Sequence, residues 1–104
     1  MRKVLLEITL TADVLAPQQL PALLRRVSEA LPPTVHGDKV ITISGRLPVW
    51  AFAAIVHLLH PFAAVATFDP RLRGGVVVAS HVLDAKVGDV IDVSDAEKVA
   101  ITFP

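Results

Sequence analysis

The chain contains no cysteine, and this absence excludes several kinds of chemistry. Disulfide bonds, thiolate nucleophiles, and zinc or iron–sulfur centres held by cysteine all need that residue. Histidine and carboxylate side chains are therefore the plausible protein ligands for a metal ion. A nucleophile elbow is also missing, so serine- or cysteine-protease chemistry has no support. The lack of disulfides fits a cytoplasmic protein.

The chain also lacks a net charge, because ten Lys and Arg residues balance ten Asp and Glu residues. A protein that grips a nucleic-acid duplex through bulk positive charge needs an excess of basic residues, so DNA binding is not expected. Any recognition of phosphate must be local. Apolar residues make up 53% of these 104 residues, against 19% charged, which exceeds the needs of one small core. We expect the surplus to cover an interface in a homo-oligomer.

No segment qualifies as a membrane span or a signal peptide. Residues 49–68 carry no formal charge, but His57, His60 and Pro61 would lie near the middle of the bilayer. Glu7 interrupts the apolar stretch after the basic amino terminus, and no small-residue cleavage site follows. Repeats, linkers and low-complexity segments are absent as well. We expect one domain, residues 1–104, without membrane association.

Hydrophobic periodicity divides the chain into strands and helices. Apolar residues that alternate with polar ones indicate strands, and apolar residues at helical spacing indicate helices. The expected order is strand, helix, strand, helix, strand, strand and a final short strand, at residues 4–11, 20–31, 39–44, 48–60, 63–68, 75–80 and 99–103. Pro17 suits a first helical turn, and Pro32 and Pro33 stop the first helix.

This order predicts an α/β fold. Right-handed crossovers make the first three strands a parallel unit with both helices packed on it. Proline and glycine in residues 69–74 favour a hairpin, so the fourth strand should run antiparallel. The expected architecture is a single small sandwich with a mixed, mainly parallel sheet. The helix at 48–60 is apolar nearly all round and should be largely buried, with His57 as a hydrogen-bonded core residue.

Ligands of open α/β sheets bind beyond the carboxyl ends of parallel strands, which here gathers Thr11, residues 44–46 and residues 69–71. Ser44, Gly45 and Arg46 offer a hydroxyl, close backbone approach and a guanidinium near a helix amino terminus, a combination that holds a phosphodiester. The alternative is a turn with a solvated arginine. Trp50 could stack on a base, although packing is the commoner role of such a residue.

A second set of candidates combines the hairpin with histidines. Asp69 and Arg71 flank Pro70 and suit a metal or base beside a phosphate clamp; the alternative is an ion pair in a turn. Arg73 adds positive charge, which favours an anionic ligand. His60 and His81 should lie at the opposite edge of the subunit, and with Asp69 they could bind a divalent cation or exchange protons. A ligand that touches both edges needs two molecules. His36 reads as a loop residue.

Four motifs resemble the CRISPR-associated Csx-three family over residues 40–93. They are Ile43-Ser44-Gly45-Arg46 with Pro48 and Trp50, Asp69-Pro70-Arg71-Leu72, Val76-Val77-Val78 leading to Ser80-His81, and Gly88-Asp89-Val90-Ile91. The resemblance implies a ring nuclease that binds and cuts cyclic tetra-adenylate, the second messenger of type III CRISPR systems. It also implies manganese dependence, activity at the 3′ end of RNA, and dimers, or tetramers and higher stacks, that enclose the ring between subunits.

The expected roles follow from the motifs and the resemblance together. The expected catalytic residues are His60, Asp69, Arg71 and His81; the expected Mn²⁺ ligands are His60, Asp69 and His81; the expected ligand-binding residues are Thr11, Ser44, Gly45, Arg46, Trp50 and Arg71. His57 competes with His60 for the histidine role, and Arg73 makes the hairpin one residue longer than is usual in the family. Two other functions stay open: a module that binds the cyclic nucleotide without cutting it, and a manganese-dependent RNA 3′ exonuclease that acts on short RNA 3′ ends.

Overall fold

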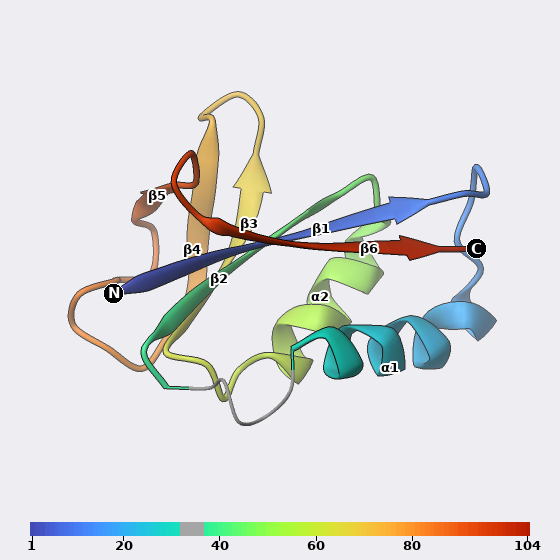
Figure 1. Cartoon of the computed structure of the whole chain (residues 1–104), viewed down its shortest axis with the longest axis horizontal. Coiled ribbons are helices and arrows are strands. Elements are labelled where there is room, and N and C mark those ends of the chain that lie inside the picture. Colours follow the sequence, from blue (N-terminus) through green and yellow to red (C-terminus); the bar gives the residue numbers. More distant parts are fainter. Residues whose placement is uncertain (32–36) are drawn as a thin grey trace.

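The structure, a computed structural model, describes residues 1–31 and 37–104, and its centre is a six-stranded sheet. Two helices cover one face of this sheet, as Figure 1 shows. The elements are β1 (Arg2–Leu10), η1 (Pro17–Gln19), α1 (Leu20–Ala30), β2 (Lys39–Gly45), α2 (Val49–Leu58), β3 (Ala64–Asp69), β4 (Gly74–Ser80), β5 (Val90–Asp92) and β6 (Glu97–Phe103). Pro32, Pro33 and His36, for which the sequence made predictions, lie outside the described residues.

The sheet has the order β5-β4-β3-β2-β1-β6 and is mixed. β1, β2 and β3 are parallel neighbours, and β6 is parallel to β1. β4 is antiparallel to β3, and β5 is antiparallel to β4. The strand order runs in one direction through β1, β2 and β3, so right-handed crossovers place α1 and α2 on the same face. The predicted α/β sandwich with a mixed, mainly parallel sheet is confirmed. The C-terminal strand takes the edge next to β1.

The main core lies between the sheet and the helices. Alternate residues of β1, including Leu6 and Ile8, are buried together with Leu23 and Val27 of α1 and Ile55 of α2. Apolar residues that alternate along the strands and recur at helical spacing along the helices thus meet in one apolar layer. Burial of this layer supplies the main stabilisation of the fold.

The prediction that the second helix is largely buried was wrong. α2 ends at Leu58 and buries Ala51 and Ile55, whereas Val49 is 84% exposed. His57 is also exposed, so its predicted place in the core was wrong. The physical reason is that a helix on one face of a single sheet has only one side covered, however apolar its other side is. Among the described residues, no helix is long and apolar enough to cross a membrane.

The opposite face of the sheet has a second, smaller apolar cluster. It contains Val40, Ala66 and Val77 and is closed by Ala85 from the loop 81–89. The sheet curls so tightly here that a Cβ built on Gly75 would lie 2.6 Å from the Oγ1 of Thr42, two strands away. Glycine at 75 therefore permits the close approach of β4 to β2. The loop leaves the carboxyl ends of β1 and β2 uncovered, and the candidate site lies there.

Candidate functional site

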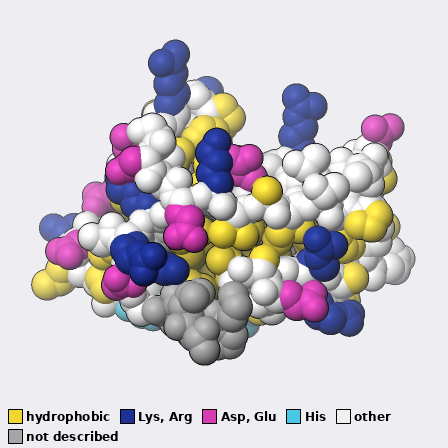
Figure 2. Space-filling view, viewed as in Figure 1, with side chains coloured by type: hydrophobic (Ala, Val, Ile, Leu, Met, Phe, Trp, Pro, Cys, Tyr) yellow, Lys and Arg dark blue, Asp and Glu magenta, His cyan; other side chains and the backbone are white. Residues whose placement is uncertain are grey.

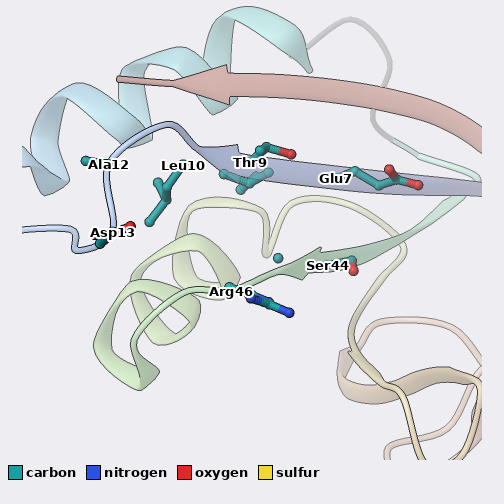
Figure 3. A pocket seen from close by; sticks show the side chains of 9 residues that line it. Glu7, Thr9, Leu10, Ala12, Asp13, Ser44 and Arg46 are labelled. Carbon is teal, nitrogen blue, oxygen red and sulfur yellow. The ribbon is translucent and has the colours of Figure 1, made fainter.

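A pocket of about 490 Å³ opens at the carboxyl ends of β1 and β2. Its lining residues are Glu7, Ile8, Thr9, Leu10, Ala12, Asp13, Ser44, Gly45 and Arg46. In Figure 3, Glu7, Thr9 and Leu10 come from β1, Asp13 from the loop after it, and Ser44 and Arg46 from the end of β2 and the turn that follows. The pocket therefore occupies the position where parallel sheets bind ligands.

A second pocket, also of about 490 Å³, adjoins the first. It shares Leu10, Asp13, Gly45 and Arg46 with the first pocket and adds Val14, Leu15, Leu47, Pro48 and Trp50. We call the two pockets together the carboxyl-edge groove. One part is rich in hydroxyl and charged groups, and the other is mostly apolar with an indole ring in its wall. Trp50 is 38% exposed, so the platform role left open by the sequence is sterically available.

Several polar groups in the groove have no partner within the described chain. The hydroxyls of Thr9 and Ser44, the guanidinium of Arg46 and the carboxylate of Asp13 make no side-chain hydrogen bond or ion pair with the described residues. Glu7 differs, because its carboxylate lies 3.8 Å from the ammonium of Lys98. Donors and acceptors that the fold does not use are free to bind a ligand, and Arg46 is the groove's cation for an anionic group.

Gly45 is required at the end of β2, where it lines both pockets of the groove. It pairs with Ile8 across the parallel ladder, and its φ is 157°. A Cβ at this position would lie 2.5 Å from the carbonyl oxygen of Ile8, a distance that real side chains do not tolerate. The glycine lets β2 stay in register with β1 up to the turn that carries Arg46.

Thr11 lies at the same edge but faces away from the groove. Its backbone N–H donates to the carbonyl oxygen of Phe103 at 3.0 Å, and its hydroxyl lies 3.5 Å from the same oxygen. Glu7, Thr9 and Asp13 line the groove instead, and the sequence reasoning missed them. The alternation of β1 was a usable signal for Glu7 and Thr9, since both lie on the strand's wetter face and Glu7 pairs with Ser44. Asp13 lies in a loop, where no periodicity points to it.

We call the end of the sheet where β1, β2 and β3 have their carboxyl ends the carboxyl edge. The hairpin between β3 and β4 carries Asp69 and Arg71 at this edge, outside the groove lining. The Oδ1 of Asp69 accepts a hydrogen bond from the Arg71 N–H at 2.8 Å and lies 3.7 Å from the Arg71 Nε. The Arg71 side chain is 91% exposed, so this pair contributes only about 0–1 kcal/mol to stability. Arg73 has a φ of 55°, which closes the turn in a left-handed conformation. Arg71 therefore keeps most of its guanidinium available to an anion.

Three histidines gather at the opposite edge, which we call the histidine edge: His57, His60 and His81. The ring centroids of His60 and His81 are 6.0 Å apart, and those of His57 and His60 are 6.1 Å apart. The Nε2 of His81 lies 2.7 Å from the carbonyl oxygen of His60. A carbonyl only accepts, so Nε2 carries the hydrogen, and a neutral His81 keeps a free lone pair on Nδ1. That nitrogen can accept a proton or bind a metal ion.

The two edges are well separated within one subunit. His81 is tied to the start of β3 by its N–H, which donates to the carbonyl oxygen of Ala63 at 2.9 Å. Asp69 ends the same six-residue strand. Five steps of about 3.3 Å place the two ends about 17 Å apart. The expected His60, Asp69 and His81 set is therefore not assembled in one subunit, and the described residues hold no group of three or more ligands suited to a metal ion. A site that uses all three must combine two subunits.

Charged side chains are dispersed on the face of the molecule that Figure 2 shows. Figure 2 shows basic and acidic side chains interspersed over one face, with no large patch of a single sign. Recognition of an anion must therefore rely on individual groups such as Arg46 and Arg71.

Outside the groove, hydrogen bonds hold the pKa of the Asp92 carboxyl below its usual range. The Ser94 N–H makes the larger contribution and the Ser94 hydroxyl the next.

The fold and these two edges define a small α/β protein with a groove at the carboxyl ends of its parallel strands. Comparison with known families makes the assignment specific. Residues 8–92 match the family model of the CRISPR-associated protein (Cas_csx3), and the chain belongs to this family. An uncharacterized protein of Aquifex aeolicus (strain VF5) is 51% identical over 51 residues, which are 49% of this chain and 46% of that protein. The chain thus matches less than half the length of this relative.

Proposed function

We propose that this protein is a ring nuclease, a phosphodiesterase that binds cyclic tetra-adenylate and cleaves it to linear products, so that type III CRISPR signalling is switched off. The observation that carries the proposal is the placement of polar groups at the carboxyl edge and of histidines at the opposite edge of one sheet. The carboxyl edge offers unpartnered groups for a nucleotide, and the histidine edge offers groups for proton transfer. A ring held between two subunits meets one edge of each.

Binding is assigned to the carboxyl edge. Arg46 and the Ser44 hydroxyl hold a phosphate near the amino terminus of α2, where the backbone amides favour negative charge. Arg71 reaches a neighbouring phosphate, and Trp50 stacks on a base. The zero net charge is no obstacle, because a compact ring needs only a few local contacts, unlike a long polyanion.

Proton transfer is assigned to the histidine edge of the partner subunit together with Asp69. His81 accepts at Nδ1 the proton of the attacking hydroxyl as that oxygen bonds to phosphorus, and His60 supplies a proton to the leaving oxygen as its bond to phosphorus breaks. In the metal-dependent form of this assignment, the imidazoles of His60 and His81 and the carboxylate of Asp69 would instead hold Mn²⁺, which would stabilise charge on the phosphate. A His81 that binds the metal through Nδ1 has no nitrogen left for proton transfer, so the two roles of His81 are alternatives. Arg71 neutralises charge on the phosphate from the carboxyl edge.

The direct test is incubation of the purified protein with cyclic tetra-adenylate, with and without manganese, followed by liquid chromatography and mass spectrometry. Linear di-adenylate that forms only with manganese establishes a metal-dependent ring nuclease. His60→Ala, Asp69→Ala and His81→Ala should each abolish turnover, whereas Glu29→Ala, an exposed change on α1, should not. Unchanged turnover in all three variants would contradict the assignment.

A binding module that senses or sequesters the ring is the second candidate. It is favoured by the completeness of the carboxyl-edge groove within one subunit, without any histidine. In the same experiment, a binding module would leave cyclic tetra-adenylate uncut and bound to the protein. An RNA 3′ exonuclease ranks third, since a net charge of zero gives little help in gathering a long RNA. Preference for linear RNA over the ring would favour it.

A further inference from the structure

Asp13 is a carboxylate in the groove to which the proposed function gives no task. It lies on the loop after β1 and lines both pockets of the groove, as Arg46 does. The Asp13 side chain makes no hydrogen bond or ion pair with the described residues, and in particular none with Arg46. Glu7, the other carboxylate of the groove, already has Lys98 as a partner at 3.8 Å. Asp13 is thus the free negative charge beside the site that must take a phosphate.

The two pockets suit different parts of a nucleotide. The apolar pocket with Leu15, Pro48 and Trp50 suits a flat base, and the polar pocket with Ser44 suits a phosphate. The sugar joins base to phosphate, so it lies at the boundary of the two pockets. Asp13 and Arg46 are the charged residues at that boundary.

The negative charge of the Asp13 carboxylate limits which groups of a nucleotide it can bind. A carboxylate repels a phosphate and accepts hydrogen bonds only, so its partner must be a neutral donor of the ligand. At the boundary that donor is a sugar hydroxyl. Acidic side chains serve the same purpose in dinucleotide folds, where they bind the ribose 2′-hydroxyl, and this hydroxyl is the group that distinguishes RNA from DNA.

We infer that Asp13 accepts a hydrogen bond from a ribose 2′-hydroxyl and makes the groove selective for ribonucleotides over deoxyribonucleotides. This inference rests on the proposed function and adds the residue that determines sugar specificity. A hydrogen bond to a charged acceptor supports about tenfold discrimination or more, and tenfold equals about 1.4 kcal/mol.

The test compares the affinities of cyclic tetra-adenylate and its all-2′-deoxy counterpart by isothermal titration calorimetry, with EDTA present to prevent manganese-dependent turnover. Wild type, Asp13→Ala, Asp13→Asn and the control Glu29→Ala are each titrated with both rings. Wild type and Glu29→Ala should prefer the ribose ring by tenfold or more. Asp13→Ala should lose most of this preference, and Asp13→Asn, whose amide oxygen still accepts a hydrogen bond, should retain part of it.

The ratio of the two affinities separates the roles open to Asp13. A merely structural role would weaken both rings equally in Asp13→Ala, and a merely repulsive charge would tighten both equally; an unchanged ratio overturns the inference in either case. If wild type binds the ribose ring and Asp13→Ala keeps the full preference, the inference fails while the proposed function stands. If wild type binds neither ring, both fail.

Discussion

The separation of the two edges predicts that pairs of inactive variants restore each other. Asp69→Ala disables the carboxyl edge, and His81→Ala disables the histidine edge about 17 Å away along β3. Each variant alone should lose about 10²–10⁴-fold in ring cleavage, the usual range for loss of a group that transfers protons. When the two are mixed, a site that takes its carboxyl edge from the His81→Ala subunit and its histidines from the Asp69→Ala subunit is intact.

The size of the recovery follows from counting. In an equal mixture, half the carboxyl edges and half the histidine edges are intact, so about a quarter of the sites formed between two subunits carry both, whether the interface is isologous or head-to-tail. Cleavage should therefore recover to about a quarter of the wild-type rate per subunit and should peak at equal amounts of the two variants.

The assay measures loss of cyclic tetra-adenylate after the variants are unfolded together in urea and refolded, so that subunits mix. Same-edge pairs are the matched controls: Asp69→Ala with Arg71→Ala, and His60→Ala with His81→Ala, should recover nothing. Native mass spectrometry of a tagged variant verifies mixing. If mixed oligomers form and the opposite-edge pair is no more active than the same-edge pairs, the two-subunit site is refuted.

Three further predictions concern single positions. Trp50→Ala should weaken binding of the cyclic tetra-adenylate ring by about tenfold or more with little change in melting temperature, because stacking on a base contributes about 1–3 kcal/mol and the indole is partly exposed; since Trp50 is the only tryptophan, wild-type fluorescence should change on binding, and a silent titration of a bound ring would contradict stacking. Gly75→Ala should destabilise the fold by about 1–3 kcal/mol, measured as a lower urea midpoint, because the new Cβ would lie 2.6 Å from the Thr42 Oγ1; an unchanged midpoint would show that the curl of the sheet can relax. Ser94→Ala should raise the pKa of Asp92 toward its ordinary value in an NMR titration, because a hydroxyl donor is lost. A depressed carboxyl pKa contributes stability above the unfolded-state pKa and loses it as pH falls, so the acid-dependent loss of stability should be smaller in this variant.

Part of the site could be predicted because it depends on strand direction alone. Once β1, β2 and β3 are parallel, Ser44 to Arg46 and Asp69 to Arg71 must lie at one edge, and the histidines after α2 and β4 must lie at the other. Side-chain direction within a loop is not determined in this way. Thr11 is expected in the groove from its position, yet it faces Phe103, and Asp13 takes a place in the groove that no pattern indicates.

The sequence by itself determined the order of the strands and helices other than β5, the parallel unit and the hairpin, because apolar periodicity and proline or glycine act over short distances along the chain. It missed the three-residue strand β5 (Val90–Asp92), which is too short to show a period. Only the tertiary structure decided that β6 lies beside β1, that one side of α2 stays exposed with His57 on it, and that two pockets meet at Asp13. These features depend on which surfaces pack against each other across the whole fold. Local periodicity carries no information about that packing.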